Sequence, residues 1–125
     1  MTWREISRDN LTAAKSLLSD ARWRSSVSRA YYAAFAALSG ALQRVVSLPA
    51  DRDAPAHSSM PLLIKNYLSR LHVLDRRTLM SDVRKLYDLR ISADYRVTRT
   101  IDRATSLLAV KLATRVIEML DQTNA

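Results

Sequence analysis

The sequence contains no cysteine, one glycine and three prolines among its 125 residues. Without cysteine there can be no disulfide, no thiolate nucleophile and no zinc site that depends on sulfur. A single glycine excludes glycine-rich phosphate loops and most tight β-hairpins. Because 48% of the residues are hydrophobic, the chain can still bury a core, and its length suits one domain. We therefore expect a single helical domain over residues 1–125.

Long hydrophobic runs are also missing. The longest uninterrupted apolar run, Ala30 to Leu38, is far shorter than the roughly 20 residues that a membrane span requires. Arg4, Glu5 and Arg8 stand where a signal peptide would have its apolar core. The sequence therefore predicts a cytoplasmic protein with no membrane segment.

Positive charge is what the sequence has in excess. Twenty Lys and Arg against twelve Asp and Glu give a net charge of +8. Most of these cations are arginines, which indicates an anionic partner such as nucleic acid. Genome composition can also enrich arginine, and a net charge does not say where the charge lies on the surface.

Helix start and stop signals divide the chain into about five helices joined by short connections. The expected caps are Ser58 or Ser59 for the third helix, Asp75 for the fourth, and Thr98 or Thr100 for the fifth. Apolar residues at helical spacing continue through all five segments, and these stripes include Val45, Tyr87 and Leu108. The helices should cover roughly residues 3–20, 22–47, 58 onward, 76–95 and 98 or 100 to 121, with an exposed loop at 48–56. The fold class is therefore all-α, an antiparallel up-and-down bundle of four to five helices.

Arg90 is the first candidate site residue. It follows Leu86 by four positions and Tyr87 by three, so the apolar face of this helix turns the guanidinium toward the interior or its edge. Asp94 lies four residues further on the same face, close enough for a charge-assisted pair. One interpretation is a structural bridge that fixes helix packing. The other is a half-buried arginine that lines an anion-binding cleft.

Arg29 and Tyr32 form a second candidate on the long helix. Both flank the apolar stripe to which Tyr31 belongs, so they should lie where core meets surface. A tyrosine ring can stack on a base while a guanidinium binds phosphate oxygens, which suits RNA or nucleotide contact. The same pair of residue types is also typical of a dimer interface.

Two strings together resemble the HEPN domain family of small helical proteins. They are Ser28-Arg29-Ala30-Tyr31-Tyr32-Ala33-Ala34-Phe35 on the long helix and Leu86-Tyr87-Asp88-Leu89-Arg90-Ile91-Ser92-Ala93-Asp94-Tyr95. The resemblance covers roughly residues 8 to 120. It implies a helical bundle, a homodimer with the arginine motifs facing a shared cleft, and in many members ribonuclease activity. Several members are toxins paired with a minimal nucleotidyltransferase as antitoxin, and others bind nucleotides or partners.

The chain departs from the nuclease pattern of the family, in which an arginine is followed after four to six residues by histidine. Counting on from Arg90 reaches Tyr95 instead. A metal-independent ribonuclease needs a base near neutral pKa, and histidine titrates at about 6.5 whereas tyrosine titrates at about 10. Ribonuclease activity is therefore expected to be weak or absent, and Arg90, Asp94 and Tyr95 are retained as the candidate catalytic set.

The same spacing occurs between Arg52 and His57, but Pro55 makes this segment a loop without fixed geometry. His57 could still approach the cleft from the start of the third helix, but we expect it to face solvent in the loop or first turn. The two histidines, fifteen positions apart, do not make a metal site, so neither a metal nor another cofactor is predicted. Arg96 could bind RNA or nucleotide beside Arg90. The same basic surface could be extended by Arg99 and Arg103, and by Arg22 and Arg24 on another segment. A solvated run of charges is the alternative.

Three functions remain open at this point. The leading one is a HEPN-type protein of a toxin-antitoxin or nucleotide-signalling module that binds RNA or nucleotide phosphates through Arg90 in a dimer cleft. The second is a dimeric adaptor without catalysis that docks a nucleotidyltransferase and is modified on Tyr95, a residue suggested by the resemblance alone. The third is a helical scaffold in which Arg90 and Asp94 serve only packing.

Overall fold

A computed structural model describes residues 1–45, 57–69 and 71–122. In these ranges it contains α-helices, one short 3-10 helix and no strand. The elements are α1 (Trp3–Ser19), α2 (Trp23–Gln43), η1 (His57–Ser59), α3 (Met60–Tyr67), α4 (Val73–Tyr95) and α5 (Arg103–Gln122). The predicted all-α bundle of four to five helices is confirmed. The loop expected at 48–56 lies outside the described residues.

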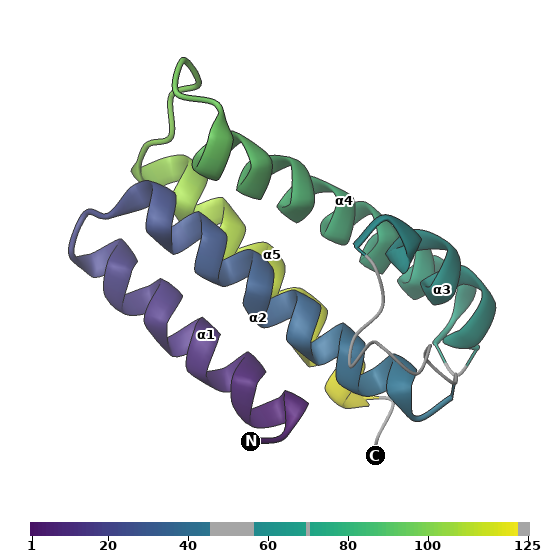
Figure 1. Ribbon diagram of the computed structural model, residues 1–125. Helices are drawn as coiled ribbons and strands as arrows, with labels where there is room; N and C mark the ends of the chain where they lie inside the picture. Colours follow the sequence, from purple (N-terminus) through teal and green to yellow (C-terminus); the bar gives the residue numbers. More distant parts are fainter. Residues whose placement is uncertain (46–56, 70, 123–125) are drawn as a thin grey trace.

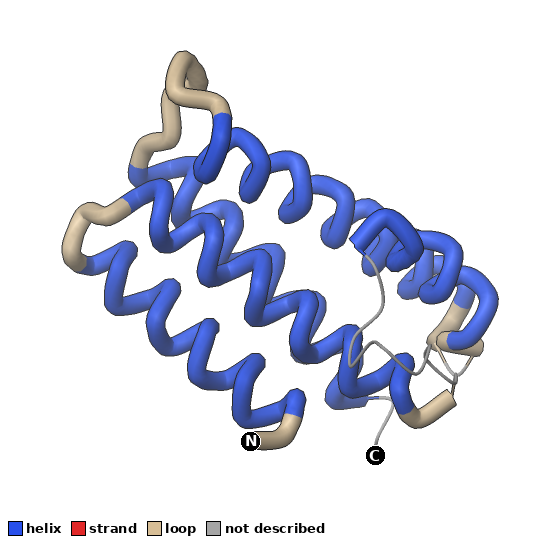
Figure 2. Tube along the Cα trace, viewed as in Figure 1, coloured by secondary structure: helices blue, strands red, loops and turns tan. Residues whose placement is uncertain are grey.

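The long helix α2 is the centre of the bundle and packs against α1, α4 and α5. Figure 1 shows that α1 and α4 run in one direction while α2 and α5 run in the other, and Figure 2 shows the connections at the ends of the bundle. The short helix α3 packs mainly on α4. Apolar residues of all five helices form one continuous core, as expected when each amphipathic helix buries one face.

Small residues allow α1 and α2 to lie very close together. The Ser7 hydroxyl on α1 donates to the Ala33 carbonyl on α2 at 2.7 Å. A Cβ on Gly40 would lie 3.0 Å from the Cβ of Trp3, which is too close for an unstrained contact. The only glycine of the chain therefore serves helix packing rather than a turn.

The structure corrects two predicted helix starts. Helix α4 begins at Val73, where the Nδ1 atom of His72 accepts a hydrogen bond from the backbone of Leu74 at 3.2 Å, so Asp75 lies in the first turn and is not the cap. Helix α5 begins at Arg103, later than Thr98 or Thr100. Both corrections have the same cause, since a polar side chain that satisfies a free N–H at a helix start sets the boundary and several candidates compete within a few residues.

Several residues assigned to the apolar stripes are exposed, among them Val45, Tyr87 and Leu108, so that part of the prediction is wrong. Helix α2 ends at Gln43, earlier than expected, and Val45 lies in the turn beyond it. Tyr87 on α4 and Leu108 on α5 lie at the edges of their apolar faces and reach the surface. Periodicity alone does not locate such an edge, because the width of the buried stripe depends on which helices pack beside it.

Candidate functional site

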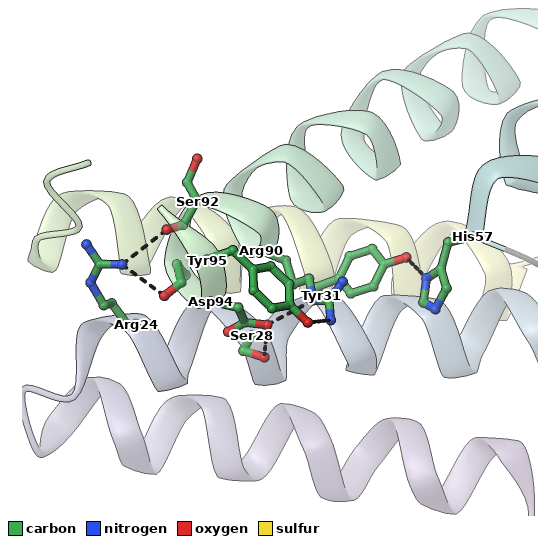
Figure 3. Close-up of polar contacts among 9 residues, drawn as sticks. Arg24, Ser28, Tyr31, His57, Arg90, Ser92, Asp94 and Tyr95 are labelled. Carbon is green, nitrogen blue, oxygen red and sulfur yellow. Dashed lines mark hydrogen bonds and ion pairs between the residues drawn. The ribbon is translucent and has the colours of Figure 1, made fainter. Parts of the chain in front are cut away.

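Arg90 lies between two tyrosines in the last turns of α4. Its guanidinium carbon is 5.4 Å from the ring centroid of Tyr32 on α2 and 5.4 Å from that of Tyr95 on its own helix. Both contacts have cation–π geometry. The Arg90 side chain is only 14% exposed, so the predicted half-buried arginine is present. Figure 3 shows it where α4 meets α2.

Asp94 orients this arginine and ties it to the neighbouring helix. Its Oδ2 atom accepts from the Nε of Arg90 at 2.9 Å and from the Ser28 hydroxyl of α2 at 3.2 Å. The predicted pair four residues apart is therefore confirmed, and Ser28 adds a link between α4 and α2 that the spacing did not reveal. The Nη2 of Arg90 also donates to the Tyr95 hydroxyl at 3.4 Å. The bonds of Arg90 to Asp94 and to Tyr95 use two of the five N–H donors of its guanidinium.

The surroundings of Arg90 keep it charged. Burial lowers the pKa of Arg90, but the neighbouring acidic groups, Tyr32 first and then Asp94, raise it, and the net shift of the pKa is upward. A fixed positive charge that is half removed from water and flanked by aromatic faces is suited to an anionic ligand that carries rings, such as a nucleotide.

His57 lies against the aromatic residues of α2, so the expectation that it faces solvent is wrong. Its ring stacks on Phe35 with centroids 4.1 Å apart and planes at 18°. Its Nδ1 atom forms a hydrogen bond with the Tyr31 hydroxyl (Figure 3). Tyr31 and Phe35 are four residues apart and lie on one face of α2. This aromatic pair is the sequence feature that could have indicated a binding position for the His57 ring. The residues next to His57 in the sequence do not indicate this contact.

Both members of the Tyr31–His57 pair are held in their neutral forms. Burial lowers the pKa of the imidazole, and the charge of Arg90 lowers it further. Burial, and then the adjacent Tyr32, raise the pKa of the Tyr31 phenol. A neutral imidazole therefore lies near the charged guanidinium, and such a ring can accept or relay a proton at neutral pH.

The structure separates two predicted binding residues from this cluster. The Nη1 of Arg29 donates to the Asn10 side chain of α1 at 3.2 Å. Arg96, at the C-terminal end of α4, donates to Asp88 at 3.3 Å and to Ser92 at 3.2 Å. Residues two apart on a helix project about 200° from each other, so the row of Asp88, Ser92 and Arg96 lies opposite that of Arg90. Of the predicted site residues, Tyr32, Arg90, Asp94 and Tyr95 come together, and Arg29 and Arg96 lie elsewhere.

Arg24 was grouped with a basic surface, but it binds the end of α4. Its Nη1 donates to the carbonyls of Ser92 and Ala93 at 3.1 and 3.0 Å, and its Nη2 to the carbonyl of Arg99 at 2.6 Å. The last carbonyls of a helix carry partial negative charge and need donors, so a guanidinium fits this position. Arg24 therefore holds the turn that carries Asp94 and Tyr95.

Neither a metal centre nor a membrane segment is found in the part of the chain that the structure describes. No three His, Asp or Glu side chains there come together in a way that could hold a metal ion. None of the helices over residues 1–45, 57–69 and 71–122 is both long and apolar enough to cross a membrane.

The protein is a small helical bundle with an arginine site between two helices. This site consists of Arg90, Asp94 and Tyr95 at the end of α4, and Tyr32 on the central helix α2 lies opposite them. The chain belongs to the HEPN domain family, whose model matches residues 1–123. The crystal structure of TT1696 from Thermus thermophilus is similar with a TM-score of 0.75 and 20% identity, covering 97% of this chain and 94% of that one. This second likeness concerns the fold. No curated protein matches the chain in sequence.

Proposed function

We propose that this HEPN protein binds RNA or nucleotide phosphates through Arg90, as a homodimer of a toxin-antitoxin or nucleotide-signalling module in the cytoplasm. The observation that carries the proposal is the placement of Arg90, which Asp94 orients and which two tyrosines flank. Three of its five N–H donors are not used by Asp94 and Tyr95 and can bind phosphate oxygens.

Binding is better supported than cleavage. Tyr95 stands where the nuclease pattern has histidine, and a phenol is a poor general base at neutral pH. A positioned acid or base contributes typically 10²- to 10⁴-fold in rate. We therefore expect RNA cleavage to be slow, and any residual rate to depend on Arg90 and on the neutral imidazole of His57.

Exposed apolar groups support a homodimer. Tyr95 on α4 and Leu108 on α5 are large hydrophobic side chains at the surface. Aromatic residues together with arginine are enriched where protein surfaces meet. In a dimer formed through Tyr95, each Arg90 would lie near the interface because the two side chains are in contact, as the family resemblance implies.

Arg90→Ala is the variant that tests phosphate binding. We expect the affinity for a single-stranded RNA to fall about tenfold or more, because a hydrogen bond from a charged donor contributes roughly 1.5–3 kcal/mol. Arg29→Ala and Arg96→Ala are matched controls, since each removes one arginine outside the cluster. Both variants should lower the affinity only slightly, and by the same factor for each RNA or nucleotide tested.

Fluorescence anisotropy at low and moderate salt measures these affinities, and thermal unfolding of the same variants separates binding from packing. The absence of any RNA or nucleotide binding by the wild type at low salt would contradict the proposal. A lower melting temperature of Arg90→Ala with unchanged affinity would favour the scaffold function.

A second candidate function is that of an adaptor modified on Tyr95 by a nucleotidyltransferase. It is favoured by the exposure of this side chain, which is 68% accessible, and by the contact of its hydroxyl with Arg90. A phenol that is open to solvent and beside a cation can be reached by an enzyme that transfers a nucleotide.

Co-expression with a neighbouring nucleotidyltransferase gene, followed by intact-mass measurement, tests this second function. The mass should increase by one or more nucleotidyl groups in the wild type and not in Tyr95→Phe. An unchanged mass, together with no co-purification of the enzyme, would count against it.

A further inference from the structure

A basic cleft lies between α3 and the start of α4, away from Arg90. Its volume is about 440 Å³. The residues that line it are Lys65, Asn66, Val73, Arg76, Arg77 and Met80. Three of these six carry positive charge and none carries a carboxylate. The cleft therefore combines apolar side chains with three cations, a combination that fits an anion attached to a larger molecule.

The side chain of Arg76 is held in this cleft by a hydrogen bond. Its Nη1 donates to the Lys65 carbonyl at 3.0 Å, which holds the guanidinium between the two helices. Its Nε is buried and has no hydrogen-bond partner within the described residues. A buried N–H without an acceptor is unfavourable, and nearly all such groups in folded proteins are satisfied by protein, water or ligand. An acceptor oxygen in the cleft would satisfy it.

The cleft and the Arg90 site lie along one side of α4. Arg76 and Arg90 are fourteen residues apart, which is close to four turns, so they differ by only about 40° around the helix axis and by about 21 Å along it. Tyr87 lies between them on the same side and is 40% exposed. A cation, an exposed aromatic ring and a second cation in line are the usual elements of a surface that binds a single strand.

We propose that the α3–α4 cleft binds a backbone phosphate of the same RNA strand whose first phosphate is bound at Arg90. This inference rests on the proposed function and names its ligand as a single stacked strand of about seven nucleotides, since phosphates on such a strand are about 3.4 Å apart and about six steps span the distance between the two sites. The Nη and Nζ groups of Arg77 and Lys65 contact the phosphate, and Tyr87 stacks on an intervening base.

The test compares a trimer of uridylate, too short to span both sites, with a dodecamer that is long enough. Lys65→Gln combined with Arg77→Gln removes two charges and keeps Arg76, whose bond to the Lys65 carbonyl supports α3. Lys15→Gln combined with Lys111→Gln is the matched control, because it removes two exposed charges from α1 and α5, neither of which packs against α3. Anisotropy titrations at several salt concentrations give the affinity and its salt dependence.

The cleft variant should bind the dodecamer about tenfold more weakly, with a slope of log affinity against log salt reduced by about 0.7, because the contact with one phosphate is lost. Its affinity for the trimer should equal that of the wild type, and the control should bind both RNAs as the wild type does. An unchanged affinity for the dodecamer, or an equal loss in the control, overturns the inference.

The outcomes also separate this inference from the proposed function. Wild-type protein that binds the trimer, with a dodecamer affinity that the cleft variant does not change, refutes the cleft alone. Wild-type protein that binds neither RNA refutes the proposed function and the cleft together. Unchanged RNA affinity with loss of the dimer in light scattering assigns the cleft to a protein interface and overturns the inference.

Discussion

Replacing Arg24 with alanine removes the side chain that joins α2 to the end of α4. Three of its carbonyl acceptors, those of Ser92, Ala93 and Arg99, lie within 2.6–3.1 Å of its Nη atoms. The variant leaves these carbonyls to water and removes the positive charge from the negative end of the helix dipole.

The expected loss of stability follows from these contacts. A hydrogen bond to a charged group contributes roughly 1.5–3 kcal/mol when it is sheltered. The site of Arg24 is partly exposed, so we discount the sum and expect a total of about 2–4 kcal/mol. For a domain of this size, about 4 °C of melting temperature corresponds to 1 kcal/mol, which gives a decrease of about 8–16 °C.

Thermal and urea unfolding measure this change, with Arg22→Ala as the control. Arg22 is exposed and makes no side-chain hydrogen bond at the start of α2, so its loss should change the free energy of unfolding by less than about 0.5 kcal/mol. Arg24→Ala should also weaken RNA binding, because Asp94 and Tyr95 lie on the turn that Arg24 holds. Equal stability of the two variants would refute this reasoning.

Two further predictions concern charged and titrating groups away from that turn. Asp82 is 1% exposed and accepts two bonds of 2.6 Å from Arg115, so Arg115→Ala should lower the free energy of unfolding by about 3–5 kcal/mol because it leaves a buried carboxylate unpaired. The double variant with Asp82→Ala should be more stable than Arg115→Ala in urea unfolding, and a less stable double variant would contradict this. Burial, and then the charge of Arg90, lower the pKa of His57. The unfolded chain therefore takes up this proton at a higher pH than the folded chain. The contribution to the free energy of unfolding is complete above about pH 6.5 and decreases below it. His57→Gln should flatten this decrease between pH 7 and pH 5 in urea unfolding, and an equal decrease in both proteins would rule out a contribution from His57.

The pairing of Arg90 with Asp94 could be predicted because both residues lie on one helix. Four residues along a helix fix the separation of two side chains within narrow limits, whatever else packs nearby. The stripe of Leu86 placed this face toward the core, and the low exposure of Arg90 follows from it. The helical class was predictable for the same reason, since periodicity is a local property.

The contacts of His57 and Arg24 could not be predicted in this way. Tyr31 precedes His57 by 26 residues, and the carbonyl of Ser92 follows Arg24 by 68. Contacts at such separations depend on how the helices align and on the path of the connections, and neither leaves a periodic trace in the chain. The separation of Arg29 from Arg90 has the same origin, because the closeness of α1 to α2 gives Arg29 a partner in Asn10.

The sequence by itself determined the helical bundle and the arginine and aspartate at the end of α4, because spacing along single helices encodes both. The family was indicated by the resemblance of two residue strings. Only the tertiary structure decided which residues surround that arginine. Packing of α4 on α2 placed Tyr32 over the guanidinium, and the position of η1 beside α2 brought His57 to Tyr31. The tertiary structure also places Arg24 at the carbonyls that end α4, and it forms a basic cleft beside α3. The positive charge that the sequence showed only as a total is thus divided by the fold between structural arginines and those that we propose bind a phosphate.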